Sequence, residues 1–432
     1  MPPCPDCQLA LPVGGPAKDS LEDIREDIFG AIIANVPDRA FEASHPHIDF
    51  RLDLRGLDPG SWSLLGEAKS KSQHVSLALL SPATSQEMMQ VYLARGVMAT
   101  TAIEGNTLSE DEVRAILEGE LKLPPSRQYL QQEVENVLGA YNDAFKELTA
   151  NPEQPLTVDW FKRFNARILE DLELEEGVVP GEIRDHSVVV GRYRGAPAED
   201  CEYLLERLCQ WLASDEFDAP ADHPELAAPL AIVKAIVAHL YLAWIHPFGD
   251  GNGRTARLFE LQVLLSAGFP PAACQLLSNH YNLTRTDYYR RLDQATRENN
   301  EVVFISYAIR GFVDQLKEQL DRIWRQQFTD RWEQFVYQTF GGVQSETKHR
   351  RLRLVLAVSK SEEPVPRAAV PTLTPVLARA YADKTSKTVT RDLNAIQELG
   401  LLRREPGGFV PANEQIVGLG GSVSGVLDDA DG

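Results

Sequence analysis

The chain has 432 residues and a mass of 48.1 kDa, and its composition is 43% hydrophobic and 25% charged. This balance excludes a wholly disordered or collagen-like chain, and the length predicts two or three domains. A formal net charge of −20 would repel nucleic acid from the chain as a whole. Five cysteines and no uninterrupted run of eighteen apolar residues predict a cytoplasmic protein without a disulfide scaffold or a membrane-spanning helix.

The first 44 residues are predicted to form a leader with one short helix at 21–35. The Pro-rich stretch 1–16 lacks the basic and then apolar layout of a signal peptide. Cys4 and Cys7 have the spacing of half a zinc knuckle, but no second pair follows at a usable distance. We therefore expect this leader to hold no metal.

Most segments between Ser61 and Tyr337 have apolar residues three or four positions apart, a pattern typical of helices. The sequence therefore predicts a mainly α protein, with an N-terminal helical region at 45–150 and a core at 151–340. The expected helices cover residues 61–75, 85–102, 109–118, 126–150, 158–172, 201–213, 224–245, 254–267, 285–299 and 301–337.

One segment breaks the helical pattern. Residues 188–195 read Val-Val-Val-Gly-Arg-Tyr-Arg-Gly, and β-branched residues before a glycine and an aromatic residue favour a β-hairpin. A lone two-stranded hairpin is only marginally stable, so it needs a surface to lie on. We expect it to form a lid over a neighbouring site.

The composition changes beyond Gly341-Gly342. Helices followed by a small hairpin outline a winged helix-turn-helix, predicted at 345–413, with a flexible tail at 414–432. The expected helices there cover residues 350–358, 368–382 and 386–399, and two short strands follow around a Gly-Gly turn.

This C-terminal unit differs in charge from the rest of the chain. Residues 348–412 hold twelve Lys and Arg against six Asp and Glu, a formal +6, which leaves the remainder near −26. Lys387, Thr388 and Arg391 on its third helix have side chains that can reach DNA phosphates or base edges. A protein-interaction or dimerisation unit would look similar, so both alternatives stay open.

The most informative segment is Trp244-Ile-His-Pro-Phe-Gly-Asp-Gly-Asn-Gly-Arg-Thr-Ala-Arg-Leu. Its glycines let the backbone turn tightly into a helix whose free N–H groups suit phosphate. Arg254 and Arg257 lie three positions apart, so both project from one face of that helix and complete a polyphosphate cradle. Asp250 is the only carboxylate of the loop and is placed to hold Mg²⁺. The imidazole of His246 titrates near neutrality, which suits a general base.

These residues resemble the signature of the Fic (filamentation induced by cAMP) family, His-x-Phe-x-(Asp/Glu)-Gly-Asn-Gly-Arg-x-x-Arg, at every specified position. The resemblance implies a helical bundle with a β-hairpin flap and, with Mg²⁺, transfer of AMP from ATP to a Ser, Thr or Tyr hydroxyl of a protein. Glycine at position 253, where the kinase-like Doc branch carries lysine, favours nucleotidyl over phosphoryl transfer. The resemblance implies His246 as the base, Asp250 as the metal ligand, and Gly251, Asn252, Gly253, Arg254 and Arg257 as ATP-binding residues.

An upstream segment, Thr100-Thr-Ala-Ile-Glu-Gly-Asn, resembles the inhibitory motif (Ser/Thr)-x-x-x-Glu-(Gly/Asn) of the family's N-terminal-inhibitor class. The motif falls on Thr100, Glu104 and Gly105, and it implies that Glu104 pairs with Arg257. A carboxylate there would occupy the donor meant for the γ-phosphate and misplace the α-phosphorus of ATP. The alternative is that the same residues simply end a helix, and both roles are compatible.

Two further assignments come from the same resemblance. Val188, Val189, Val190 and Gly191 occupy the place of the flap, which would hold a target by strand-like pairing. Tyr288 falls where relatives carry residues near the adenine, although a Tyr pair on a helix is also typical of a core.

Two other functions remain open at this point. One is removal of AMP, with Glu104 as the base; the other is a DNA-binding regulator whose Fic fold only senses nucleotide. The expected partners are protein substrates, with self-modification and a homodimer among the alternatives, DNA through the winged helix, and no membrane.

Overall fold

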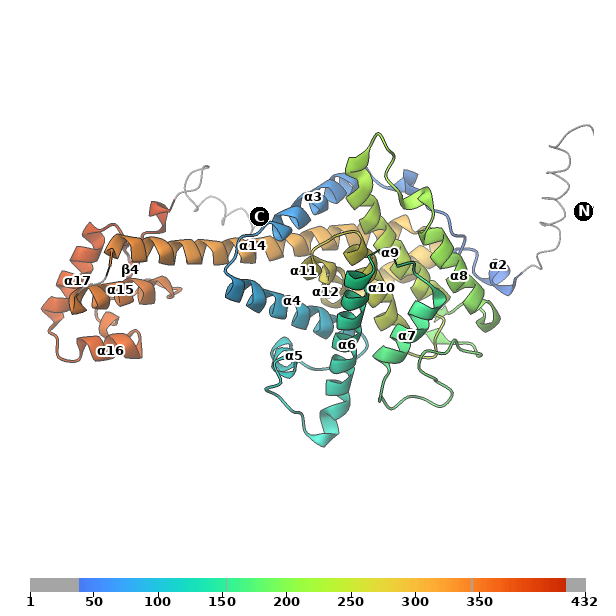
Figure 1. Cartoon of the computed structure of the whole chain (residues 1–432), viewed down its shortest axis with the longest axis horizontal. Coiled ribbons are helices and arrows are strands. Elements are labelled where there is room, and N and C mark those ends of the chain that lie inside the picture. Colours follow the sequence, from blue (N-terminus) through green and yellow to red (C-terminus); the bar gives the residue numbers. More distant parts are fainter. Residues whose placement is uncertain (1–38, 153, 343–344, 417–432) are drawn as a thin grey trace, which may run out of the picture.

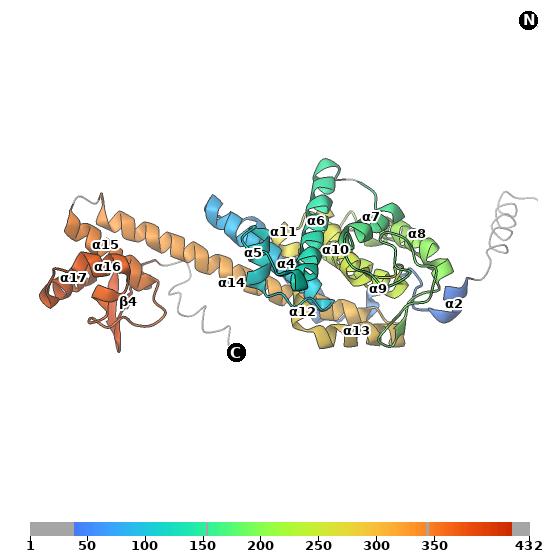
Figure 2. The same cartoon turned by 90° about the horizontal axis from the view of Figure 1, so that it is seen from below.

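A computed structural model describes residues 39–152, 154–342 and 345–416. The Cys4–Cys7 pair, the helix expected at 21–35 and the tail from residue 417 onward lie outside these ranges. Within them the chain is mainly helical, as predicted, with two short antiparallel hairpins (Figures 1 and 2).

The helices predicted within the described residues agree with the observed ones to within a few residues, except for the one expected at 368–382, which is shortened because Pro371 and Pro375 interrupt it. The helices at 40–44, 271–274 and 276–283 were not predicted. The helices are α2 Ala40–Ser44, α3 Pro59–Ser76, α4 Pro82–Ile103, α5 Glu110–Leu117, α6 Gln128–Ala150, α7 Val158–Ile168, α8 Cys201–Leu212, α9 Ala227–Ile245, α10 Asn252–Ser266, α11 Pro271–Cys274, α12 Leu276–Leu283, α13 Arg285–Glu298, α14 Val302–Phe340, α15 Glu346–Ser359, α16 Pro375–Tyr381 and α17 Ser386–Glu398; the strands are β1 Val189–Val190, β2 Tyr193–Arg194, β3 Leu402–Glu405 and β4 Gly408–Pro411.

Helix α9 is the centre of the larger part of the molecule. It is apolar on all sides, as a helix buried all round must be, and it packs against α3, α8, α10 and α14. The expectation that the chain has no helix fit to span a membrane needs correction, because the window at Pro224–Ile245 is long and apolar enough by length and hydropathy. In the fold, 67% of that window is buried inside the protein, as for a central core helix.

The structure has two hydrophobic cores, and their limits differ from the predicted domains. One continuous core runs from Phe41 to Leu316, so it joins the region 45–150 to most of the region 151–340. A second core includes Trp332, Val336 and Phe340 together with residues of α15 to β4. Helix α14 therefore contributes its first half to one core and its last turns to the other, and Figure 1 shows it joining the two parts.

The C-terminal unit consists of α15, α16 and α17 followed by the β3–β4 hairpin, in the order expected from the sequence. Asp392 of α17 lies at its centre. Its carboxylate accepts hydrogen bonds from Nε of Arg350 and Nε of Arg351, each at 2.7 Å, and from the Tyr381 hydroxyl at 3.0 Å. Burial opposes the charge of Asp392, but these hydrogen bonds outweigh it and hold its pKa below the ordinary value.

Asp392→Asn is expected to destabilise this unit by about 3 kcal/mol, because it leaves the partly buried Arg350 and Arg351 without their counter-charge. Hydrogen exchange of residues 346–411 in the full chain measures the effect. Asp383→Asn, at an exposed aspartate of the same unit, is the control and should change exchange little. Since the folded pKa of Asp392 is depressed, its stabilisation should be complete above about pH 5 and fall as the pH drops through that pKa. Equal exchange in both variants would contradict this account.

Candidate active site

The loop between α9 and α10 is held in shape by its own polar groups. Helix α9 ends where His246 takes a left-handed conformation, with φ 52° and ψ 58°. The side chain of Asn252 accepts a hydrogen bond from the Phe248 N–H at 2.9 Å and donates one to the Phe248 carbonyl at 2.8 Å. Gly251 has φ +76°, which explains a glycine directly before α10. These contacts fix the loop before any ligand binds.

Asn165 of α7 is a second support of the loop that the sequence reasoning missed. Its side-chain amide donates to the carbonyl of Asp250 at 2.9 Å and accepts from the N–H of Gly181 at 3.0 Å. One fully buried amide therefore joins the phosphate loop to the segment that leads into the flap.

His246 is neutral in this environment. Desolvation in the loop lowers its pKa to about 4; the carbonyl of Ala243 and the carboxylates of Glu104 and Asp250 oppose the shift, while Arg184 adds to it. A neutral imidazole at physiological pH can accept a proton, which is what a general base requires.

The low pKa gives a direct prediction for the free protein. The imidazole of His246 should not titrate between about pH 5.5 and 8, because it is already neutral throughout that range. Histidine-selective NMR measures this, with His246→Ala assigning the signal. A midpoint near 6.5 for that signal would contradict the burial-based account.

Arg254 and Arg257 lie on the first turns of α10, and both side chains are buried, with 6% and 1% exposed. Arg254 donates to Oδ1 of Asp250 at 3.1 Å. Asp250 itself is half exposed at the edge of the loop. Two buried guanidinium groups beside a helix N-terminus are the kind of arrangement that attracts anions such as phosphate.

Arg257 is already paired in this structure. Nε donates to the Thr100 hydroxyl at 2.7 Å, and Nη2 donates to Oε1 of Glu104 at 2.6 Å and to the Thr100 carbonyl at 3.1 Å. Burial opposes the charge of Glu104, but Arg257 outweighs it and holds the pKa of Glu104 below its ordinary value. Glu104 also ends helix α4, and Gly105 follows with φ +106°. The motif therefore does both things that the sequence suggested: it ends helix α4, and its glutamate pairs with Arg257.

Gly253 lies directly against this ion pair. A Cβ at position 253 would lie 2.2 Å from Oε1 of Glu104 and 3.1 Å from Nη1 of Arg257. Any side chain there would displace the Glu104 carboxylate. Glycine at this position is thus needed for the pair with Arg257 as well as for the approach of a phosphate.

Asn106 and Glu133 also belong to this region, and the sequence reasoning assigned them no role. The Asn106 side chain donates to the Leu130 carbonyl at 3.0 Å and to Oε2 of Glu133 at 2.8 Å. Glu133 in turn lies 3.9 Å from Arg254. The turn after Glu104 is therefore anchored on α6, next to the second phosphate-site arginine.

The predicted flap is the β1–β2 hairpin, whose register pairs Val189 with Arg194 and Val190 with Tyr193. Gly191 turns the chain with φ +60°, and the Val188 carbonyl accepts from the N–H of Gly195. Val189 and Val190 are 54% and 46% exposed. Two exposed apolar residues on so short a strand leave an edge open to another chain.

The hairpin rests on α9 and on the segment before α3. The Tyr193 hydroxyl donates to the Trp244 carbonyl at 2.5 Å, and Nε2 of His45 lies 2.9 Å from the Arg194 carbonyl. The His47 ring contacts Trp244 edge-on, and burial lowers the pKa of His47 to about 4. No helix was predicted at 45–60, and the support that this segment gives to the hairpin was not predicted.

The placement of Tyr288 corrects one expectation. Its side chain is 3% exposed, its hydroxyl lies 3.0 Å from Nε2 of His239, and its ring stacks on Tyr281. Tyr288 thus belongs to the core, and its neighbour Tyr289 is the exposed member of the pair. Helical spacing alone does not distinguish which of two adjacent tyrosines faces the interior.

Lys387 and Arg391 are exposed one turn apart on α17, and Thr388 is half-buried. Several basic residues of the unit are paired with acids, which reduces the positive charge that its surface offers. Arg350 and Arg351 bind Asp392, and Arg403 lies 3.3 Å from Glu414.

Residues 155–264 match the Fic/DOC family. Protein adenylyltransferase fic-1 of Caenorhabditis elegans is 33% identical over 199 residues, which cover 46% of this chain and 36% of that protein. Protein adenylyltransferase Fic of Nematostella vectensis is 32% identical over 199 residues, covering 45% and 42%. The chain thus spans less than half the length of these curated relatives.

Two solved structures share the fold. A Fic family protein from Desulfovibrio desulfuricans G20 has a TM-score of 0.51 at 20% identity, over 82% of this chain and 94% of that one. A Fic-1 fragment from C. elegans has a TM-score of 0.50 at 24% identity, over 61% and 72%. The match to the Fic/DOC family thus covers residues 155–264, and the loop from His246 to Arg257 lies within it.

Proposed function

We propose that this protein is an adenylyltransferase that moves AMP from ATP to a hydroxyl group of a protein. The observation that carries the proposal is a neutral His246 at the rim of a loop whose next helix offers two buried arginines to phosphate. The names of the relatives at 32% and 33% identity support the same activity.

In this reaction each residue of the loop would have a separate role. Arg254 and Arg257 would hold the β- and γ-phosphates of ATP, and the α10 N–H groups would hold the remaining oxygens. His246 would take the proton of the target hydroxyl while its oxygen bonds to the α-phosphorus. The bond between the α-phosphorus and the bridging oxygen then breaks, and pyrophosphate leaves with the electron pair.

The residues present fit a divalent cation in the mode that Mg²⁺ commonly uses with nucleotides. Mg²⁺ needs only one or two carboxylates when substrate phosphates supply other ligands. Asp250 is half exposed beside the anion site, and no group of three or more His, Cys, Asp or Glu in the described ranges is arranged for a metal. Asp250 would hold the ion, which when bound neutralises phosphate charge.

We also propose that Glu104 inhibits the enzyme. Its pair with Arg257 occupies a nitrogen that would otherwise bind the γ-phosphate. ATP bound without that contact would place its α-phosphorus away from the line of attack, and small misplacements are costly for transfer. Three properties stay predictions from the sequence: a location in the cytoplasm, a homodimer, and contact with DNA through a winged helix.

The test uses the Glu104→Gly variant with ATP labelled at either the α or the γ position. Label retained on protein from the α position only, including self-modification, is the expected result. Label from the γ position only would indicate a kinase. Label from neither, with salt-dependent DNA binding, would favour a nucleotide-sensing regulator. Loss of AMP from a modified protein that depends on Glu104 would favour the reverse reaction.

A further inference from the structure

The buried guanidinium of Arg184 meets four backbone carbonyls. Nε donates to the His246 carbonyl at 2.7 Å, Nη1 to that of His186 at 2.6 Å, and Nη2 to that of Ala196 at 2.5 Å, with the Ile245 carbonyl 3.5 Å from Nη2. The residue is 5% exposed. Among the described residues, its charge is thus compensated by carbonyl dipoles and not by an ion pair with a carboxylate.

These carbonyls belong to two different parts of the site. His186 and Ala196 flank the β1–β2 hairpin on either side, while Ile245 and His246 form the end of α9. The backbone of the same segment adds further contacts, because the Arg184 N–H donates to the Pro247 carbonyl at 3.0 Å and the Ala196 N–H donates to that of Ile245 at 3.3 Å. One side chain therefore ties both ends of the flap to the loop.

The conformation of His246 gives the hydrogen bonds of Arg184 a role beyond packing. A residue with a Cβ rarely adopts φ 52° and ψ 58°, and such a conformation persists only where the surroundings hold it. Arg184 binds the carbonyl of that residue. Without this contact the carbonyl of His246 loses the donor that holds it, and the imidazole can shift with the backbone.

We propose that Arg184 is a positioning residue for AMP transfer. It holds the imidazole of His246 and the base of the flap in one fixed relation, so that a hydroxyl presented by the flap meets the base. The proposal rests on the proposed function for its kinetic consequence, but the structural link can be measured separately.

Gly195 offers an independent way to disturb the same link. A Cβ there would lie 2.9 Å from Nη2 of Arg184 and 2.9 Å from the Cβ of His246. Gly195→Ala should therefore shift the guanidinium without removing it. Gly66→Ala on α3, where a Cβ meets no atom within 4 Å, is the matched control.

The experiment places Arg184→Gln, Arg184→Lys, Gly195→Ala and Gly66→Ala in the Glu104→Gly protein. We expect Arg184→Gln to lower kcat by about 100-fold, with ATP affinity changed less than about threefold, since it misplaces the base and leaves the phosphate arginines intact. Arg184→Lys should recover part of the loss, Gly195→Ala should lose at least about tenfold, and Gly66→Ala should lose nothing.

Hydrogen exchange gives the second readout. Amides of residues 186–196 and 245–248 should exchange faster in Arg184→Gln than in the parent, while those of α3 and α14 stay unchanged. An Arg184→Gln protein with the parent's kcat, or with the parent's protection of the flap, overturns the proposal. If Glu104→Gly itself transfers no AMP, the proposed function fails, and the exchange pattern still decides the role of Arg184.

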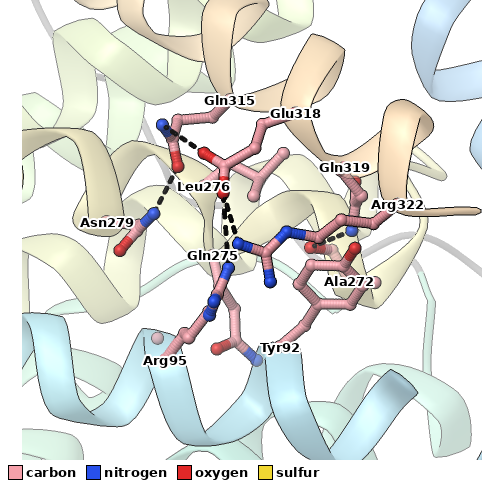
Figure 3. Close-up of a pocket in the computed structure, with 11 residues that line it drawn as sticks. Tyr92, Arg95, Ala272, Gln275, Leu276, Asn279, Gln315, Glu318, Gln319 and Arg322 are labelled. Atoms are coloured by element: carbon pink, nitrogen blue, oxygen red, sulfur yellow. Dashed lines mark hydrogen bonds and ion pairs between the residues drawn. The ribbon is translucent and has the colours of Figure 1, made fainter. Parts of the chain in front are cut away.

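A separate observation concerns helix α4, which carries Thr100 and ends at Glu104. Along it, Gly96 lies directly against Gln275, the residue between α11 and α12: a Cβ at position 96 would be 1.6 Å from Oε1 of Gln275 and 2.8 Å from its Cβ. Beside this contact is a cavity of about 10 Å³ between α4, α11, α12 and α14, lined by the buried side chains of Tyr92, Gln275 and Gln319. Figure 3 shows these groups converging.

We call the contact of Gly96 with Gln275 and the adjoining cavity the α4 junction. An ion pair between α14 and α4 lies along one side of this junction. Oε1 of Glu318 on α14 lies 2.7 Å from Nη2 of Arg322 and 3.5 Å from Nη1 of Arg95 on α4 (Figure 3). A junction lined by polar and charged groups separates at lower cost than an apolar one, because water hydrates those groups as it opens.

We infer that this junction sets the strength of inhibition. Gly96 and Glu104 are eight residues apart on one helix, about 12 Å, so a displacement at Gly96 is carried to the pair between Glu104 and Arg257. The inference rests on the proposed inhibition by Glu104. It adds the place at which that inhibition can be relieved.

Gly96→Ala tests it, with Gly66→Ala as the control. The added methyl group collides with Gln275 and should push α4 away, which raises AMP transfer at least about tenfold over the wild type. Gln275→Gly in the same chain removes the three nearest colliding atoms and should restore inhibition. Glu318→Ala, which breaks the ion pair with Arg95 without a collision, should raise activity by about threefold or more and covers the case in which Gly96→Ala does not fold.

Glu104→Gly is the reference for full release. If it is active while folded Gly96→Ala and Glu318→Ala both match the wild type, the inference is wrong. If Glu104→Gly is no more active than the wild type, the inhibition itself is wrong and the inference falls with it.

Discussion

Glu104→Gly is expected to raise AMP transfer by about 100-fold over the wild type, because it frees a buried guanidinium for the γ-phosphate and lets the α-phosphorus align. In the present structure Glu104 is the carboxylate bound to Nη2 of Arg257, at 2.6 Å. The Thr100 contacts to the same arginine remain in the variant and keep it oriented toward the site. Incorporation of α-labelled ATP into protein, followed over time at saturating ATP, measures the gain.

Two further variants make this result specific. Glu104→Gln keeps the shape of the side chain but loses its charge, so it should give an intermediate gain. Glu120→Gly removes an exposed glutamate after α5 and should leave the rate at the wild-type level. Equal rates for wild type and Glu104→Gly would contradict inhibition through Arg257.

His246→Ala in the Glu104→Gly protein is expected to reduce transfer by about 1,000-fold, the range in which general bases contribute. The residue lies outside the phosphate cradle formed by Arg254 and Arg257. ATP affinity should therefore change by no more than about threefold, and the loss should appear in kcat. Stopped assays for transfer and equilibrium binding of ATP to the same preparation separate the two quantities.

His223→Ala is the control for the loss of a histidine, since that side chain is exposed and distant in sequence. It should keep full activity. A His246→Ala protein that still transfers AMP within about tenfold of its parent would mean that another group accepts the proton.

The segments that could be predicted from the sequence are those whose structure and chemistry depend on residues close together in the chain. The loop from His246 to Arg257 and the motif from Thr100 to Gly105 are each contiguous, so a few letters contain both the geometry and the chemistry. Helices with a clear apolar stripe were placed to within a few residues for the same reason. The pair between Glu104 and Arg257, 153 positions apart, followed only from the family resemblance.

Other features could not be read from the chain in this way. Arg184 acts on carbonyls up to 62 positions away, and backbone carbonyls give no residue-type signal. Gly96 looks like any helical glycine until Gln275 is placed against it. Tyr288 and Tyr289 have the same local pattern, and only the position of His239 and Tyr281 decides which one is buried. Helix α14 was predicted at nearly its full length, but its part in two cores depends on the tertiary fold.

The central claim is that the loop holds ATP with its α-phosphorus facing the imidazole of His246. A crystal structure of the Glu104→Gly protein with a non-hydrolysable ATP analogue and Mg²⁺ tests it most directly. The account predicts the γ-phosphate on Arg257 and the α-phosphorus within reach of a hydroxyl bound to His246. An analogue bound in the opposite direction, with its γ-phosphate at His246, would contradict it.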